Sequence, residues 1–290
     1  MRYRLLALDL DGTLLGPGDV IGARTLAAIA EARRRGVHVA VVTGRRFRSG
    51  RPLVEPLVDG GDFVFASSNG IVTRWACEGS RIFTGYLAPS DLGDLLAFLR
   101  DEEGGAPLVL ADGFEAGVDF LYDREHEDPF WAGSFARLRP LFHRVERLPD
   151  DAPYPFIQIA MWSRPAPLDA LAARFATRFG DRFTAHVVRN FKVGRAVFEA
   201  YPATSGKAHA VRRIAAHLGV APSEICAIGD EVNDLEMLRE AGLGIAMGDA
   251  QPAVLEAADV VTARHDEDGV GVAVERWVLG DLVPPPPLVP

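Results

Sequence analysis

Near its start the chain carries Leu5-Leu6-Ala7-Leu8-Asp9-Leu10-Asp11-Gly12-Thr13-Leu14, a short apolar run that delivers two carboxylates into a glycine turn. Residues two positions apart in an extended segment point the same way, so Asp9 and Asp11 are expected to face one site. Two carboxylates about 4 Å apart repel by roughly 4 kcal/mol at an effective dielectric near 20. A cation between the two acids explains such a pair. So does a hydrated Asp-rich turn, because Asp and Gly are common turn residues.

Helix and strand patterns alternate after this run. A helix is predicted over 23–35, and a β-branched strand over 37–42 ends at Thr43-Gly44-Arg45-Arg46. A second helix is predicted at 51–58 and a third strand at 63–66. This alternation predicts right-handed βαβ units and a parallel sheet.

From residue 71 the pattern changes to adjacent strands with occasional helices, which is typical of an α+β unit. The parallel pattern resumes with a strand at 197–200, a helix at 205–218 and a strand at 225–228. The expected fold class is therefore α/β: a Rossmann-like, doubly wound parallel-sheet core with an inserted α+β cap domain, a division that suits a chain of 290 residues. The expected divisions are core at 1–84 and 191–282, cap at 85–190, and a flexible Pro-rich tail at 283–290.

Composition excludes several classes of partner. A net charge of −9 argues against nucleic acid or an anionic membrane surface as the main partner. No stretch is long and apolar enough for a membrane span, and the first residues lead directly into a strand rather than a signal peptide. Cys77 and Cys226 are too few for a disulfide scaffold and fit a reducing cytosol, so a cytoplasmic location is expected. Whether the protein is a monomer or a dimer stays open.

Four polar groups are expected to meet at one edge of the parallel sheet, because open parallel sheets bind ligands beyond the carboxyl ends of their strands. These groups are Asp9 with Asp11, Thr43 with Gly44, Lys207 at the start of a helix, and Asp230 with Asn233 and Asp234.

The donor types in these groups indicate phosphoryl chemistry. Several carboxylates with few other ligands favour a hard cation such as Mg²⁺. An ammonium, a hydroxyl and backbone N–H groups are what a phosphate needs. Of 31 basic residues only Lys192 and Lys207 are lysines, which makes a specific need for an ammonium at Lys207 more plausible. Lys192 is better explained as a linker residue.

At these positions the chain resembles the haloacid dehalogenase-like (HAD) superfamily. Its four motifs are matched by Asp-Leu-Asp-Gly-Thr at 9–13, Thr-Gly-Arg at 43–45, Lys207, and Gly-Asp-x-x-Asn-Asp at 229–234. Their order and spacing resemble the Cof-type sugar-phosphatase branch, in which a large α+β cap of the C2 type follows the third strand. The segments at 69–70, 244–250 and 266–270 resemble that branch too.

The resemblance implies a role for each site residue. Asp9 would be the nucleophile that forms an aspartyl-phosphate, and Asp11 would be the acid and base. Mg²⁺ would bind the side chains of Asp9 and Asp230 and the backbone carbonyl of Asp11, with Asp234 acting through water. The phosphoryl and substrate ligands would be Thr43, Gly44, Lys207, Asn233 and, unless it is structural, Arg45. Glu231 departs from the small residue that the last motif usually has there.

The leading hypothesis is thus an Mg²⁺-dependent phosphatase, a phosphoric monoester hydrolase that acts on a small phosphorylated metabolite such as a sugar phosphate. The alternatives are a phosphomutase of the same superfamily and a non-catalytic, ligand-binding relative. The presence of Asp11 argues against the latter, because a phosphate receiver needs no acid or base.

Overall fold

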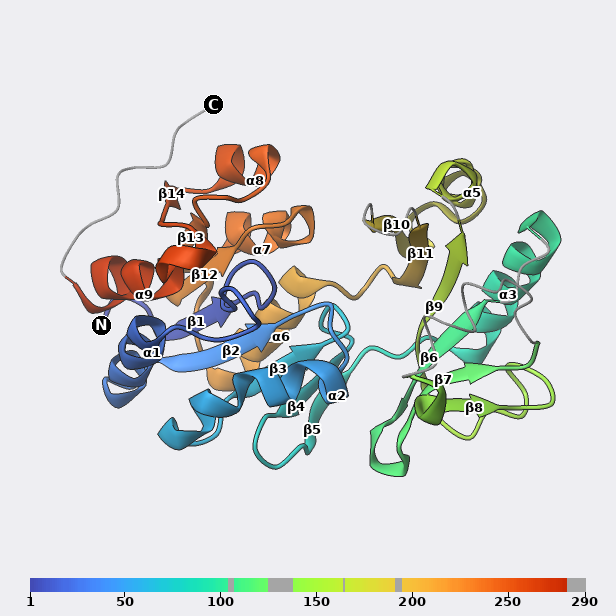
Figure 1. Ribbon diagram of the computed structural model, residues 1–290, viewed down its shortest axis with the longest axis horizontal. Helices are drawn as coiled ribbons and strands as arrows, with labels where there is room; N and C mark the ends of the chain where they lie inside the picture. Colours follow the sequence, from blue (N-terminus) through green and yellow to red (C-terminus); the bar gives the residue numbers. More distant parts are fainter. Residues whose placement is uncertain (104–106, 125–137, 164, 191–194, 281–290) are drawn as a thin grey trace. The chain divides into compact units, whose positions relative to one another are not determined.

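The computed structural model describes residues 1–103, 107–124, 138–163, 165–190 and 195–280. The chain divides into two compact units (Figure 1). The first, the core, contains Met1–Thr84 together with the chain from Gly206 onward, and the second, the cap, contains Gly85–Ser205. The predicted tail at 283–290 lies outside the described residues, and so does Lys192.

The core contains one eight-stranded sheet in the order β14-β13-β12-β1-β2-β3-β4-β5 (Figure 1). Neighbouring strands are parallel from β14 to β3, whereas β4 and β5 are added antiparallel. The strands are β1 (Leu5–Leu8), β2 (His38–Val42), β3 (Val64–Ser67), β4 (Val72–Trp75), β5 (Arg81–Thr84), β12 (Ile225–Gly229), β13 (Leu243–Ala246) and β14 (Val260–Val261).

The first strand lies at the centre of this sheet, and all four of its residues are buried. In the register, Leu8 lies opposite Val41 of β2 and Ile228 of β12, and both pairings are parallel. The chain continues from β1 to β2 on one side and returns to β12 on the other, so β1 marks a topological switch point. The residues that follow these three strands therefore meet at one edge.

Helices of the core pack in two groups, α1 with α9 and η8, and α6 with α7. Their bounds are α1 (Ala23–Arg34), α2 (Phe47–Gly50), η1 (Arg51–Gly60), α6 (Lys207–Leu218), η5 (Pro222–Glu224), η6 (Val232–Asp234), α7 (Leu235–Glu240), α8 (Pro252–Ala257), η7 (His265–Glu267), α9 (Gly269–Ala273) and η8 (Val274–Leu279). The helix predicted at 51–58 is a 3-10 helix, η1, and Pro56 in its interior disfavours a regular α-helix because its ring clashes with the carbonyl one turn earlier.

The cap contains a six-stranded sheet in the order β10-β11-β9-β6-β7-β8, antiparallel except between β7 and β8. The hydrophobic interior of the cap is formed by leucines of α3, aromatic residues of α5 and one face of the sheet. The elements are α3 (Pro89–Glu103), β6 (Leu108–Gly113), η2 (Phe114–Ala116), β7 (Val118–Tyr122), η3 (Arg139–Leu141), β8 (Phe142–Arg144), β9 (Phe156–Ser163), α5 (Pro165–Phe179), η4 (Gly180–Arg182), β10 (Phe183–Asn190) and β11 (Arg195–Pro202). The predicted fold class, a parallel-sheet core with an inserted α+β cap, is confirmed.

The sequence predicts that the chain returns from the cap to the core at residue 191, but the position of β11 shows that the return comes later. This strand pairs antiparallel with both β9 and β10, so the segment at 197–200 belongs to the sheet of the cap. The return lies at Gly206, directly before α6. A short apolar strand shows its alternation in the sequence but not its partner, because pairing is a long-range choice.

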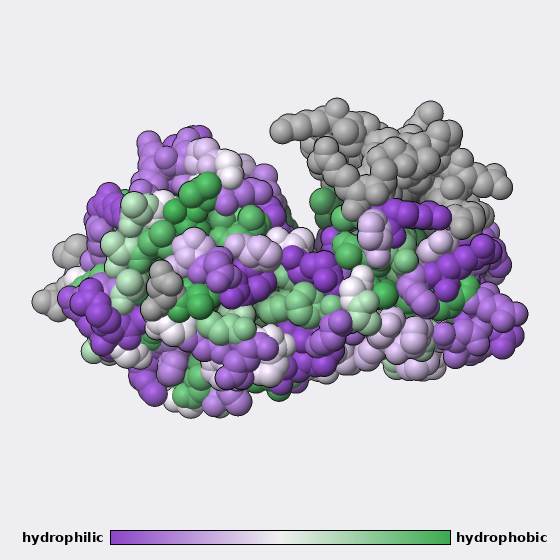
Figure 2. All heavy atoms as spheres, turned by 60° about the horizontal axis from the view of Figure 1, so that its bottom comes forward, coloured by the Kyte–Doolittle hydropathy of each residue, from purple (hydrophilic) through white to green (hydrophobic). Residues whose placement is uncertain are grey.

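Hydrophobic residues on the visible face in Figure 2 occur in patches among hydrophilic ones. This pattern is ordinary, because apolar atoms contribute more than half of a folded protein's surface. Among the helices that the structure describes, none combines the length and the apolar character that a bilayer span requires.

We predict that Phe198→Ala destabilises the cap by about 3–5 kcal/mol, because this residue of β11 is fully buried and its ring lies 5.1 Å from that of Phe175. Hydrogen exchange measured by mass spectrometry should accelerate in β6 and β9 and stay slow in β1 and β12. The matched control is Phe65→Ala, a fully buried residue of β3 in the core, which should show the reverse pattern. Faster exchange in the core strands of the Phe198 variant would contradict the assignment of β11.

Candidate active site

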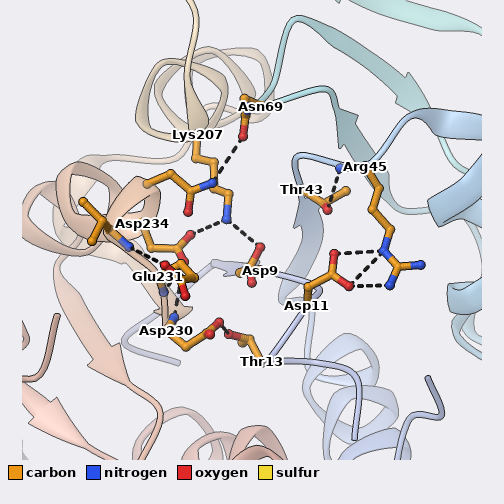
Figure 3. A network of polar contacts seen from close by, with 12 residues as sticks. Asp9, Asp11, Thr13, Thr43, Arg45, Asn69, Lys207, Asp230, Glu231 and Asp234 are labelled. Carbon is orange, nitrogen blue, oxygen red and sulfur yellow. Dashed lines mark hydrogen bonds and ion pairs between the residues drawn. The ribbon is translucent and has the colours of Figure 1, made fainter. Parts of the chain in front are cut away.

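Three neighbouring strands of the core sheet end at the candidate site. Asp9 follows β1, Thr43 follows β2, and Asp230 follows β12, while Lys207 begins α6. Figure 3 shows Lys207 joined to both Asp9 and Asp234, with Asp230 nearby and joined to Thr13. The structure thus brings together four of the predicted site residues that are far apart in the sequence.

A buried ammonium joins two of the acids. Nζ of Lys207 donates to Oδ1 of Asp9 at 2.6 Å and to Oδ1 of Asp234 at 2.7 Å. All three side chains are at most 4% exposed. Burial lowers the pKa of Lys207, but the carboxylates of Asp234 and Asp9 outweigh it and raise that pKa above its usual value. The lysine is therefore charged at neutral pH, and its one compact ammonium reaches both acids from a single atom.

The acids carry more charge than this ammonium balances. Burial, offset in part by Lys207, holds the pKa of Asp9 well above its usual range. Burial is also the largest influence on Asp230, and together with nearby Asp234 it raises the pKa of that carboxyl to about 6. Three carboxylates and one ammonium leave two negative charges in the cluster when all are ionised, which is the charge that a divalent cation would neutralise.

The same three acids have the geometry for a metal. One oxygen from each of Asp9, Asp230 and Asp234 lies within 4.8 Å of the others. Both oxygens of Asp234 are engaged, because Oδ1 accepts from Lys207 and Oδ2 accepts from the backbone N–H groups of Asp230 at 3.2 Å and Glu231 at 3.1 Å. Asp9 and Asp230 are therefore better placed for direct coordination, and Asp234 orients the lysine and the loop. An all-oxygen donor set fits Mg²⁺.

The Gly12-Thr13 turn holds Asp230 in place. Gly12 has φ of 78°, and a Cβ at this position would lie 2.4 Å from Oδ2 of Asp230. Only glycine allows both this backbone and this approach. The hydroxyl of Thr13 donates to Oδ1 of Asp230 at 2.6 Å. Thr13 was absent from the predicted site residues, although its place in the Asp-Leu-Asp-Gly-Thr motif was a usable signal.

Asp11 has different surroundings from Asp9. Its side chain is 49% exposed and accepts from Nε of Arg45 at 2.9 Å on each oxygen, whereas the side chain of Asp9 is 4% exposed. Arg45 also lies 3.6 Å from Oδ2 of Asp19. The strand ends at Leu8, so the alternation rule that placed both acids on one face does not extend to Asp11. Asp9 is buried beside an ammonium, and Asp11 is half-exposed beside a guanidinium.

The residues after β2 offer hydrogen-bond donors to the candidate site. Thr43 is fully buried, and its Oγ1 accepts from the backbone N–H of Arg45 at 3.1 Å, which leaves the hydroxyl proton to be donated elsewhere. Gly44 is exposed at this turn. Across the site, Nδ2 of Asn233 donates to Oδ1 of Asn69 at 3.3 Å. Asn69 was not among the predicted site residues.

Glu231 is occupied by its neighbours. One of its oxygens accepts from the N–H of Val232 at 3.4 Å, and the other accepts from Nε2 of Gln251 at 3.2 Å. This acid therefore caps the short helix η6 and stays apart from the three clustered carboxylates.

The parallel-sheet core with an inserted α+β cap, and the meeting of the four motifs at its strand ends, agree with the predicted resemblance to haloacid dehalogenase-like hydrolases. The family model described as haloacid dehalogenase-like hydrolase matches residues 6–274, and the chain belongs to this family. The family membership predicted from the four motifs is confirmed.

Relatives of known name match over nearly the whole chain. Phosphatase YwpJ of Bacillus subtilis is 29% identical, with 92% of this chain and 97% of the relative covered. The 5-amino-6-(5-phospho-D-ribitylamino)uracil phosphatase YcsE of the same organism is 26% identical, with 95% and 96% covered. The crystal structure of a haloacid dehalogenase-like hydrolase from Bacteroides thetaiotaomicron is 25% identical with a TM-score of 0.75, and 94% of this chain and 99% of that one are covered.

The raised pKa of Asp230 predicts a pH-dependent stability in the metal-free protein. A carboxyl whose pKa is about 6 when folded and near 3.8 when unfolded binds its proton more tightly in the folded state. Its contribution to stability therefore falls as the pH rises from about 4 to 6. Asp230→Asn should be more stable relative to the wild type at pH 7 than at pH 4.5, as measured by urea unfolding in EDTA. If the stability of the two proteins changed with pH in the same way, the raised pKa of Asp230 would be refuted.

Proposed function

We propose that the protein is an Mg²⁺-dependent phosphatase that hydrolyses a small phosphomonoester, a sugar phosphate or a similar metabolite, through an aspartyl-phosphate on Asp9. The observation that carries this proposal is the buried cluster in which Lys207 joins Asp9 and Asp234 beside Asp230. Its relative YcsE is named for a substrate with a phosphorylated ribityl chain, which supports a small phosphorylated substrate.

Asp9 would act as the nucleophile in the first step. Lys207 donates to its Oδ1, which leaves Oδ2 to attack phosphorus. The bond from phosphorus to the ester oxygen breaks as the bond to Asp9 forms. Asp11, at the more exposed position, would give a proton to the departing alkoxide, so that an alcohol leaves.

Asp11 would act as the base in the second step. It takes a proton from water as the water oxygen attacks phosphorus, and the bond between phosphorus and Asp9 breaks. Inorganic phosphate leaves, and the Asp9 carboxylate and the protonated Asp11 are restored. Lys207 beside the buried Asp9 favours the ionised form that attacks. Asp11 is half-exposed, and once Arg45 leaves it, it can exchange protons with solvent.

Charge on the transferring phosphoryl group needs donors that are already in place. Thr43 Oγ1, the backbone N–H of Gly44, the third N–H of Lys207 and the Asn233 carboxamide are the proposed donors. Arg45 would contact the substrate at the edge of the site once it leaves Asp11. A bound Mg²⁺, held by Asp9, Asp230 and the Asp11 carbonyl, would supply Lewis-acid stabilisation of the phosphoryl charge.

The proposed function also indicates the binding partners of the protein and its location in the cell. A phosphorylated small molecule is the only partner it requires, and the net charge of −9 argues against nucleic acid and anionic membranes. Both cysteines are free, which supports the cytoplasm.

Turnover of a substrate panel tests the proposal. The purified protein with Mg²⁺ should release inorganic phosphate from members of a broad panel of phosphomonoesters, and EDTA should stop the release. Asp9→Asn should abolish turnover while the circular dichroism spectrum shows that the fold remains, because the side chains have nearly the same shape. Phosphate release by this variant would show that Asp9 is not the nucleophile. If the wild type instead formed an isomerised sugar phosphate and no free phosphate, the protein would be a phosphomutase rather than a phosphatase.

The role of Asp11 predicts a dependence on the leaving group. Asp11→Asn should lose roughly 10²–10⁴-fold in kcat on an alkyl phosphate, whose alkoxide needs a proton. On p-nitrophenyl phosphate, whose phenolate leaves without one, the loss in the rate of the first step should be much smaller. Rapid-quench measurement of the phenolate burst separates this step from hydrolysis of the intermediate. Equal losses of the first-step rate on both substrates would exclude Asp11 as the acid.

A further inference from the structure

The turn that follows β3 has an unusual backbone. Ser68, Asn69 and Gly70 have φ of 51°, 54° and 83°, so three successive residues are left-handed. Such a conformation is uncommon for residues other than glycine and costs of order 1–3 kcal/mol where it is strained. Ser68 and Asn69 are also almost completely buried, at 1% and 4% exposure. The surrounding structure must therefore hold this turn firmly.

The backbone of the turn contacts the loop after β2. The N–H of Asn69 donates to the carbonyl of Thr43 at 2.8 Å, and the N–H of Ser68 donates to the carbonyl of Arg45 at 2.8 Å. The turn also contacts α6, because a Cβ on Gly70 would lie 2.4 Å from Cβ of Ala210 and 3.1 Å from the carbonyl oxygen of Gly206. The loop that ends β2 and the helix that begins with Lys207 therefore both rest on this turn.

The carboxamide of Asn69 contacts two further parts of the site. Its Oδ1 accepts from Nδ2 of Asn233 at 3.3 Å and lies 3.3 Å from the position that a Cβ on Gly44 would occupy. One side chain thus lies against both Gly44 and Asn233. The neighbouring Ser68 differs, since its Oγ is buried and has no hydrogen-bond partner within the part of the chain that the structure describes.

We propose that Asn69 is a positioning residue of the phosphoryl site: its carboxamide orients Asn233 and packs on the Gly44 turn, so that both can bind the same phosphoryl group. This inference rests on the proposed function, which makes Gly44 and Asn233 phosphoryl ligands. Removal of a residue that orients a metal ligand typically lowers metal affinity or activity ten- to a hundredfold, and we expect a loss of this order when a phosphoryl ligand loses its support.

Two glycine substitutions separate the side chain from the backbone of the turn. Asn69→Gly removes the carboxamide and suits φ of 54°, so relief of the backbone offsets part of the lost contacts and the protein should stay folded in thermal unfolding. Isothermal titration of inorganic phosphate in the presence of Mg²⁺ should show an affinity ten- to a hundredfold lower, and kcat/KM should fall by a similar factor. The matched control, Ser68→Gly, relieves the same backbone conformation one residue earlier and should leave both values unchanged.

A double-mutant cycle shows whether Asn69 acts through Asn233. If it does, the Asn69→Gly, Asn233→Ala double variant should lose less phosphate affinity than the two single losses combined, because the contact between the two side chains can be lost only once. Additive losses would overturn the proposal, and so would wild-type phosphate affinity in Asn69→Gly or an equal loss in Ser68→Gly. A wild type that binds phosphate with this coupling but hydrolyses no phosphomonoester would refute the proposed function and uphold the role of Asn69.

Discussion

The contact of Lys207 with Asp9 and Asp234 is the interaction on which the rest of the site depends. An ammonium and two carboxylates at most 4% exposed are stable together only because each satisfies the others. To form the contact, α6 must begin beside the ends of β1 and β12. The helix starts at Lys207 directly after the return from the cap, so the insertion ends where the core requires its lysine.

Glycines and turns bring the remaining groups into contact range. Gly12 lets Asp230 approach the turn after β1, and Gly70 lets α6 approach the turn after β3. Both glycines have positive φ, and at each of them a Cβ would clash with a neighbouring atom. The close packing of backbones is therefore as much a part of the site as its acids, since a site of this type needs its groups held within about half an ångström.

Much of this arrangement was predictable from the sequence because strand ends are local features. The acids after β1 and β12 and the threonine after β2 follow short apolar runs, and parallel strands bring their carboxyl ends to one edge. The difference between Asp9 and Asp11 was not predictable in this way. Their motif is continuous, but their contacts come from Lys207 and Arg45, which lie 198 and 34 residues away.

The sequence by itself determined the α/β class, the presence of an inserted unit and the identity of the acids and the lysine, because hydrophobic periodicity and motif spacing are written along the chain. Only the tertiary structure decided that β11 belongs to the cap, that Thr13 holds Asp230 and that Asn69 lies against Gly44 and Asn233. The physical reason is the same in each case. Strand pairing and side-chain packing depend on which distant segments become neighbours, and that choice is made by the free energy of the whole fold.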